Sequence, residues 1–307
     1  MANDALALTV LKPGFAAEIA GIDARTASDA QIAAIRQASL AYPVLVLPGQ
    51  ELTEDEQARF GERFGLLDVN SLLTGSYNGG LRADLLRVSN ADDDAAGPAG
   101  PTERRRLLDI GNKFWHTDSS YKPVSAHLSM LYAQQVTRTG GETEFADMRA
   151  AHDGLSDGWK ALIAGLVAAH SATHARMMLG FDDWSAAQLA QAGVAHDLVR
   201  TIPETGRTSL YLSAHASHIV GMPVPIGRML LHELTELATR PDHVHAHRWR
   251  RHDLVIWDNR CTMHRMRRYD SAHEVRALRR VTTLDPAFPA RDPATITVPA
   301  EVIDAAG

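Results

Sequence analysis

Residues 252–265 read HDLVIWDNRCTMHR, a short apolar run followed by polar turn residues and a histidine. The apolar run, Leu254–Trp257, predicts a buried strand, and the polar residues after it predict a turn. Similar short runs recur along the chain, and helical patterns do not alternate with them regularly, which argues against a doubly wound parallel sheet. We therefore expect a mainly β fold, an antiparallel sandwich or jelly roll with peripheral helices. The other predicted strands are Val44–Leu47, Leu128–Val136, Leu166–Ser171, Leu198–Ile202, Ser209–Ser213, His243–Trp249 and Arg276–Leu284.

Helix signals are fewer and shorter. Residues 53–56 read TEDE, a capping box that predicts a helix start, and apolar residues at helical spacing predict two longer helices. The predicted helices cover Asp29–Tyr42, Thr53–Phe64 and Ile226–Arg240, with two short ones after the N-caps Asp147 and Ser156. The low-complexity stretch Ala91–Arg106 predicts a mobile surface loop, either functional or simply disordered.

The composition argues against several classes of protein. Lys and Arg number 31 and Asp and Glu 37, a net charge of −6, so we expect no nucleic-acid partner. The single cysteine, Cys261, excludes an internal disulfide and fits a reducing compartment, the cytoplasm. We find no signal peptide and no apolar run of about 18 residues, so we expect no membrane partner. A homo-oligomer is compatible with the sequence.

The charge is unevenly distributed along the chain. Between Arg248 and Arg280 stand ten arginines and only four acidic residues. Arg276 and Arg280 share one face of the last predicted strand, about 13 Å apart, and Arg279 points to the other face. Two guanidinium groups entering a β core are costly unless each meets an anion. That anion is either an Asp or Glu side chain or a small carboxylate ligand, which arginine binds with two parallel hydrogen bonds.

The stretch FWHTD, residues 114–118, contains the strongest local signal for chemistry. If it is a strand, His116 and Asp118 point to the same face and supply two ligands of a 2-His-1-carboxylate metal site. A simple hydrogen-bonded pair is the alternative. His264 is a candidate third ligand, because it follows a strand and a turn and could project from a loop.

The other histidines are weaker candidates. Histidines at 243, 245 and 247 alternate along one predicted strand, but three such ligands spread over about 13 Å and cannot converge on one ion. For the pairs at 170 and 174 and at 215 and 218, we expect core or surface positions, since no carboxylate accompanies them.

Four separated motifs together resemble the TauD/TfdA family of Fe(II)- and 2-oxoglutarate-dependent dioxygenases. They are HTD at 116–118, GGETEF at 140–145, WDNR at 257–260 followed by His264, and Arg276 with Arg280. The resemblance extends from residue 43 to residue 285. Stretches such as FWHTDSSY and HASHIVGMPVPIGRMLL look closest to the 2,4-dichlorophenoxyacetate dioxygenase branch. The family fold implied is a double-stranded β-helix, here one domain over residues 1–307. The loop at 91–106 and the tail at 285–307 match poorly.

The resemblance also implies roles for individual residues. His116, Asp118 and His264 would hold Fe(II). Arg276 and Thr143 would bind the distal carboxylate of 2-oxoglutarate, and Trp257 would flank that cosubstrate.

On the substrate side, Arg280 would bind the carboxylate of a small anionic organic substrate. Asn112, His215, Lys113 and Asn70 would line its pocket. No catalytic residue beyond the iron ligands is implied.

The function implied is hydroxylation of an aryloxyalkanoate such as 2,4-dichlorophenoxyacetate with O2. The products would be a phenol and glyoxylate, together with succinate and CO2. Taurine, another sulfonate or an alkyl sulfate is the alternative substrate. The competing classes are a non-catalytic β-sandwich that binds an anion or a metal, and a zinc hydrolase.

Overall fold

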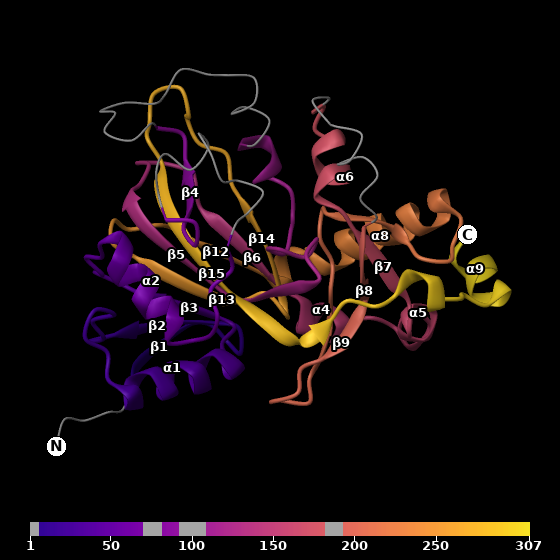
Figure 1. The fold of residues 1–307 in the computed structure, drawn as a ribbon, viewed down its shortest axis with the longest axis horizontal. Coiled ribbons are helices and arrows are strands. Elements are labelled where there is room, and N and C mark those ends of the chain that lie inside the picture. The colour runs from indigo at the N-terminus through magenta and orange to yellow at the C-terminus, as the bar shows by residue number, and fades with distance from the viewer. Residues whose placement is uncertain (1–5, 70–81, 92–108, 182–192) are drawn as a thin grey trace.

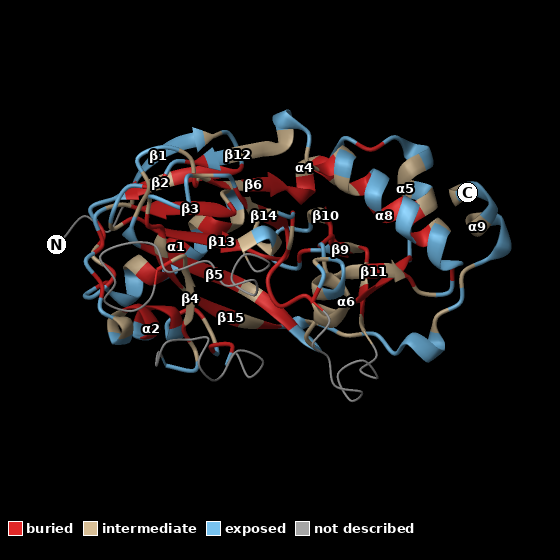
Figure 2. Ribbon diagram, turned by 90° about the horizontal axis from the view of Figure 1, so that it is seen from above, coloured by how far each residue is buried: buried red, intermediate tan, exposed pale blue. Residues whose placement is uncertain are grey.

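The computed structural model describes residues 6–69, 82–91, 109–181 and 193–307 and contains two facing β-sheets (Figures 1 and 2). The strands of the larger sheet, in spatial order, are β1 (Ala7–Lys12), β2 (Ala16–Ala20), β3 (Val44–Leu47), β13 (Leu254–Asp258), β5 (Val124–Gln135), β15 (Ala277–Pro289) and β4 (Leu86–Ser89). The smaller sheet has the order β12 (Val244–His247), β6 (Thr143–Asp147) and β14 (Thr262–Met266). All neighbouring strands in these sheets are antiparallel except β2 and β3. The expected mainly β fold is confirmed.

The sequence of strand β13 is apolar without alternation because the strand is covered on both faces. Leu254 and Ile256 join the cluster that packs against two helices, α1 (Asp29–Ala41) and α2 (Glu54–Glu62). Val255 and Trp257 face the smaller sheet. There the rings of Trp257 and Phe145 lie 5.4 Å apart. The central strand therefore connects two apolar layers, one on each side of the larger sheet.

Helices cover the outer face of the larger sheet and form a second lobe beside it (Figure 1). Helices α1 (Asp29–Ala41) and α2 (Glu54–Glu62) both begin with complete capping boxes, from Ser28 and Thr53. The predicted N-caps Asp147 and Ser156 also accept amide hydrogen bonds, as expected. The other helices are α4 (Met148–Asp153), α5 (Asp157–Ile163), α6 (Ala172–Met177), α8 (Val224–Ala238) and α9 (Ala300–Ala306).

The second lobe contains two small antiparallel sheets and a third apolar cluster. Their strands are β11 (Ala216–Ile219), β7 (Val167–His170), β8 (Val194–Asp197), β9 (Val199–Thr201) and β10 (Thr208–Leu210). Short 3₁₀ turns span Pro241–His243 and Pro293–Thr295. The poorly matched tail contains α9, whose Val302 and Ile303 pack against this cluster. Residues 92–106 of the predicted loop lie outside the described residues.

Three sequence predictions about local structure were wrong. The FWHTD stretch is not a strand: only His116 forms a β-bridge, and a turn begins at Asp118. His264 lies in strand β14 rather than in a loop, because the residues after the turn at 259–261 pair with β6. His243 belongs to a 3₁₀ turn, since Pro241 starts a turn there instead of a strand.

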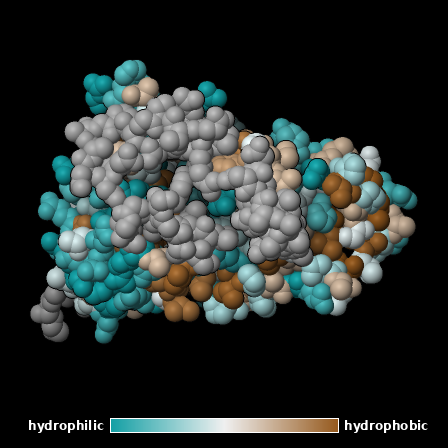
Figure 3. All heavy atoms as spheres, turned by 45° about the horizontal axis from the view of Figure 1, so that its top comes forward, coloured by the Kyte–Doolittle hydropathy of each residue, from teal (hydrophilic) through white to brown (hydrophobic). Residues whose placement is uncertain are grey.

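The surface is mixed in character. On the face shown in Figure 3, hydrophilic residues dominate the end where Figure 1 places α1 and α2, and hydrophobic residues are interspersed at the other end. Among the described residues, no helix is both long enough and apolar enough to span a membrane.

Replacing Leu45 in β3 by alanine should lower the free energy of unfolding by about 2–5 kcal/mol, because its fully buried side chain leaves a cavity between the sheet and the helices. The matched control is Leu66→Ala, since Leu66 is 76% exposed and should change stability by less than about 0.5 kcal/mol. Urea unfolding of both variants measures the difference. Equal losses would contradict this account of the core.

Candidate active site

Reciprocal backbone hydrogen bonds join the two segments that carry the candidate histidines. The amide of His116 donates to the carbonyl of His264 at 3.0 Å, and the amide of His264 donates back at 2.9 Å. The two imidazole rings consequently lie side by side, with centroids 4.1 Å apart. Strand β14 is itself fixed by pairing with β6, so the bridge places His116 at the edge of the smaller sheet.

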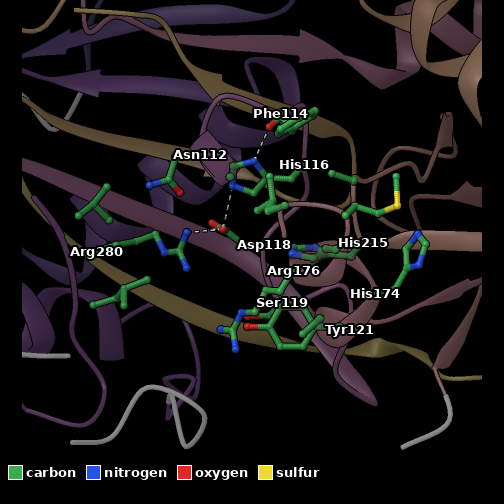
Figure 4. Close-up of a pocket in the computed structure, with 18 residues that line it drawn as sticks. Asn112, Phe114, His116, Asp118, Ser119, Tyr121, His174, Arg176, His215 and Arg280 are labelled. Carbon is green, nitrogen blue, oxygen red and sulfur yellow. Dashed lines mark hydrogen bonds and ion pairs between the residues drawn. The ribbon is translucent and has the colours of Figure 1, made fainter. Parts of the chain in front are cut away.

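Asp118 reaches the same point from the turn that follows the bridge. Between the two candidate ligands, Thr117 is buried, and its hydroxyl donates to the carbonyl of Leu212 at 2.9 Å. Asp118 Oδ1 lies 3.9 Å from His116 Nε2, as Figure 4 shows. The same oxygen lies 3.7 Å from His264 Nε2. One atom from each of these three side chains can be chosen so that all lie within 4.8 Å of one another. These three side chains could therefore hold a metal ion.

The protonation states suit a divalent cation. Burial lowers the pKa of His116 and of His264, the latter well below its usual value, so both rings are neutral and can offer a lone pair. The Nδ1 atom of His116 lies 2.8 Å from the carbonyl of Phe114, which leaves Nε2 as the ligand atom. Burial raises the pKa of Asp118, but the charge of the Arg280 guanidinium and the hydrogen bond from Ser129 act against burial, and the pKa stays well below the ordinary value. Two neutral imidazoles and one carboxylate form the donor set of a facial-triad iron site.

A hydrogen-bonded chain of side chains orients the carboxylate of Asp118. Its Oδ2 accepts from the hydroxyl of Ser129 at 2.7 Å, and that hydroxyl accepts from Asn259 Nδ2 at 2.9 Å. Asn259 Oδ1 in turn accepts from the backbone amide of Asp118 and from the indole of Trp257. With Oδ2 occupied in this way, Oδ1 is the oxygen directed at the two histidines.

Sequence reasoning missed Ser129 and assigned no role to Asn259. Asn259 stands inside the WDNR motif, which was the available signal, whereas an isolated serine in a strand carried none.

Arg276 is a buried cation with no carboxylate partner among the described residues. Its Nε donates to the carbonyl of Gly141 at 2.9 Å and its Nη2 to the hydroxyl of Thr143 at 3.1 Å. Burial lowers its pKa to about 10. A buried guanidinium in these surroundings is favourable only when it meets an anion.

The hydroxyl of Thr143 is also oriented to meet an anion. It accepts hydrogen bonds from Arg276 and, at 3.0 Å, from the indole of Trp249, so its own proton is available to another acceptor. Arg276, Thr143 and Trp257 line a narrow recess together with His116 and His264. Donors for a carboxylate therefore lie in a recess that the two candidate histidine ligands also line. This arrangement fits 2-oxoglutarate, and sequence reasoning missed Trp249.

Gly141 is required for this arrangement. Its φ is +72°, and a Cβ atom there would lie 2.9 Å from the hydroxyl of Thr137 and 3.3 Å from Cδ of Arg276. A side chain would strain the backbone and push Arg276 out of its position.

A larger cavity of about 360 Å³ opens beside the recess. Asn112 and His215, both predicted to line the substrate pocket, lie in its wall, as does Arg280. Lys113 is absent from the walls of both cavities and instead pairs with Asp109 one helical turn earlier. Asn70 lies outside the described residues.

The predicted alternation of the three arginines around β15 is observed. Arg280 pairs with Asp118 in the cavity, whereas Arg279 lies on the other face, donates to the carbonyl of Leu52 and stacks on Tyr132. Most other arginines of the basic segment form ion pairs with acidic side chains, including Arg260 with Asp258. The structure therefore singles out Arg276 from this segment.

The remaining histidines do not form a second metal site within the described part of the chain. His247 is buried and pairs with Asp253 at 3.1 Å, and His245 lies beside it on β12. His170 is fully buried in the second lobe, as expected for a core position.

Comparisons with known proteins agree with this geometry. Residues 7–282 match the family model described as "Taurine catabolism dioxygenase TauD, TfdA family". The chain belongs to the TauD/TfdA family. The predicted fold, enzyme class and cofactor set of Fe(II), 2-oxoglutarate and O2 are thereby confirmed, and neither a non-catalytic sandwich nor a zinc hydrolase is supported.

Individual members of the TauD/TfdA family are similar over most of the chain. An alpha-ketoglutarate-dependent 2,4-dichlorophenoxyacetate dioxygenase of Cupriavidus pinatubonensis is 42% identical, covering 90% of this chain and 97% of that protein. An (S)-phenoxypropionate/alpha-ketoglutarate-dioxygenase of Delftia acidovorans is 35% identical, covering 83% and 87%. The crystal structure of AAD-2 in complex with Mn(II) and N-oxalylglycine is similar with a TM-score of 0.86 and 40% identity, covering 92% of this chain and 99% of that one.

Replacing Ser129 by alanine should weaken divalent-cation binding about 10- to 100-fold, because Asp118 loses the hydrogen bond that orients its carboxylate. Isothermal titration with Mn(II) measures the affinity. Ser217→Ala is the matched control, since that buried hydroxyl donates to the carbonyl of Ala169 in the second lobe. Unchanged Mn(II) affinity in the Ser129 variant would show that the hydrogen bond does not support a metal site.

Proposed function

We propose that the chain is an Fe(II)- and 2-oxoglutarate-dependent dioxygenase that hydroxylates an aryloxyalkanoate such as 2,4-dichlorophenoxyacetate. The observation that carries the proposal is the position of Arg276, a buried cation with no carboxylate partner among the described residues, in a recess also lined by His116 and His264, which converge with Asp118. The 42% and 35% identity to aryloxyalkanoate dioxygenases supports the choice of substrate.

His116, Asp118 and His264 would hold the iron, and Arg276 with the hydroxyl of Thr143 would bind the distal carboxylate of 2-oxoglutarate. Iron bound at this site would couple the oxidation of 2-oxoglutarate to succinate and CO2 with insertion of one oxygen atom of O2 into a C–H bond of the substrate. No general base is required, and none is assigned. The residues of the chain bind and orient the reactants and exclude water.

The wall of the large cavity supports an aromatic substrate. Leu86 and Val88 of β4 face it, together with Phe114 and Leu179, and Arg280 lies beside Asp118. An apolar wall beside a cation suits an aryl ring with a carboxylate better than it suits small, polar taurine. Hydroxylation of the carbon next to the ether oxygen would give a hemiacetal, which would collapse to a phenol and glyoxylate.

We further propose that the whole chain forms one catalytic domain that acts in the cytoplasm, where the buried thiol of Cys261 stays reduced.

The proposal predicts 2-oxoglutarate-dependent succinate release with aryloxyacetates or aryloxypropionates. The test measures succinate with Fe(II), O2 and a panel of aryloxyacetates, both enantiomers of aryloxypropionates, taurine and alkyl sulfates. His264→Ala is the inactive control and should keep the fold. Turnover confined to taurine or alkyl sulfates would refute the aryloxyalkanoate assignment, and full activity of His264→Ala would refute the metal site.

Substitutions of Arg276 and of Arg280 should raise the KM of different reactants. Arg276→Ala should raise KM for 2-oxoglutarate about 30-fold or more, and Arg280→Ala should do the same to KM for the aryloxyalkanoate, because each loses a buried charge-assisted contact worth about 2 kcal/mol or more. Steady-state kinetics with each reactant varied in turn measures both KM values. If both variants raise both constants equally, the two roles are misassigned.

A further inference from the structure

Helix α6 presents one face to the large cavity. Six residues of α6 and the turn after it line the cavity: Ala172, His174, Ala175, Arg176, Met178 and Leu179. Arg176 is the one with a permanent positive charge. It forms no ion pair or hydrogen bond with the described residues. The side chain of Arg176 is half-buried, and a guanidinium that lines a cavity without an acidic partner among the described residues is suited to bind an anionic ligand.

Tyr121 lies in the same part of the cavity (Figure 4). Its ring packs edge-on against His215, with centroids 4.9 Å apart, and its hydroxyl has no hydrogen-bond partner among the described residues. Burial raises the pKa of Tyr121, and the charges of Arg280 and Arg176 both act to lower it. Arg280 of β15 and Arg176 of α6 line the same cavity as this phenol.

The two cations differ in their present contacts. Arg280 is engaged by Asp118, the carboxylate that would also ligate the metal, so only part of its hydrogen-bonding capacity is available to a substrate. Arg176 donates to no described residue. The phenol of Tyr121 adds a neutral donor in the same cavity.

We infer that Arg176 and Tyr121 complete, with Arg280, the subsite that binds the carboxylate of the organic substrate, and that Arg176 determines the preference for anionic substrates. The inference rests on the proposed function and extends it to residues of α6 and of the turn after Asp118. The substrate carboxylate would accept hydrogen bonds from two opposite walls of the cavity, which fixes its position more tightly than Arg280 alone could.

The experiment compares Arg176→Gln, Arg176→Lys and Tyr121→Phe in the Fe(II)-loaded enzyme. Arg176→Gln should raise KM for 2,4-dichlorophenoxyacetate about 10-fold or more and leave KM for 2-oxoglutarate within twofold. Arg176→Lys should recover part of the affinity because it retains the charge. Tyr121→Phe should raise the same substrate KM about threefold to tenfold. Arg59→Gln, at an exposed position on α2, is the matched control and should change neither constant.

The neutral amide of the same substrate separates charge recognition from structural damage. Arg176→Gln should reduce the preference of the wild-type enzyme for the acid over the amide about 10-fold, an effect that general loosening of α6 would not produce. An unchanged preference, or equal increases in both KM values, would overturn the inference.

Failure of the proposed substrate is distinguishable from failure of the subsite. If the wild-type enzyme uses taurine or an alkyl sulfate instead, the aryloxyalkanoate assignment fails, and the same variants are measured with that anion. A rise in KM of about 10-fold for Arg176→Gln would then still support the subsite, whereas wild-type affinity in that variant would refute it.

Discussion

The pair of backbone hydrogen bonds between His116 and His264 is the constraint on which the site depends. It joins a turn-rich segment near residue 116 to strand β14, and β14 is fixed in register by β6. Pairing within the smaller sheet also places Thr143 at the start of β6, within reach of Arg276 from the larger sheet. One set of strand pairings therefore positions the candidate metal ligands and the anion-binding recess together.

Charge compensation is distributed unequally across this site. Asp118 is held by Arg280, Ser129 and its own backbone contact to Asn259, so it is stabilised as an anion in a buried place. Among the described residues, the guanidinium of Arg276 donates only to the neutral partners Gly141 and Thr143. The protein thus satisfies the charge of its carboxylate internally and leaves that of Arg276 for a ligand, a division expected of a recess built for a dianion.

Much of the fold followed from local sequence patterns, because they coincide with burial. The run at 44–47 is apolar throughout since β3 is covered on both faces, and the capping box at Thr53 is a local signal that the structure retains. Strands β6 and β14 were missed because they are short and partly polar, and their pairing with each other is decided by distant residues. The error at FWHTD has the same origin, since a single bridge, rather than a strand, orients His116.

Site residues that belong to sequence motifs could be predicted. Those whose positions depend on contacts between distant segments could not. The three candidate ligands, Arg276 and Arg280 came from motifs and do converge. Lys113 stands next to Asn112 in sequence but pairs with Asp109, because adjacent residues point in different directions. Ser129 and Trp249 carry no local signal and take their positions from contacts with distant segments.

The uncompensated charge of Arg276 has a consequence for the lifetime of the protein as well as for its chemistry. A ligand that binds only the folded chain stabilises it in proportion to the logarithm of its concentration above Kd. A dicarboxylate bound in the recess would relieve the cost of burying that guanidinium, so occupancy and resistance to unfolding would rise together. A plentiful supply of such a ligand would thereby lengthen the time for which the folded chain resists proteolysis.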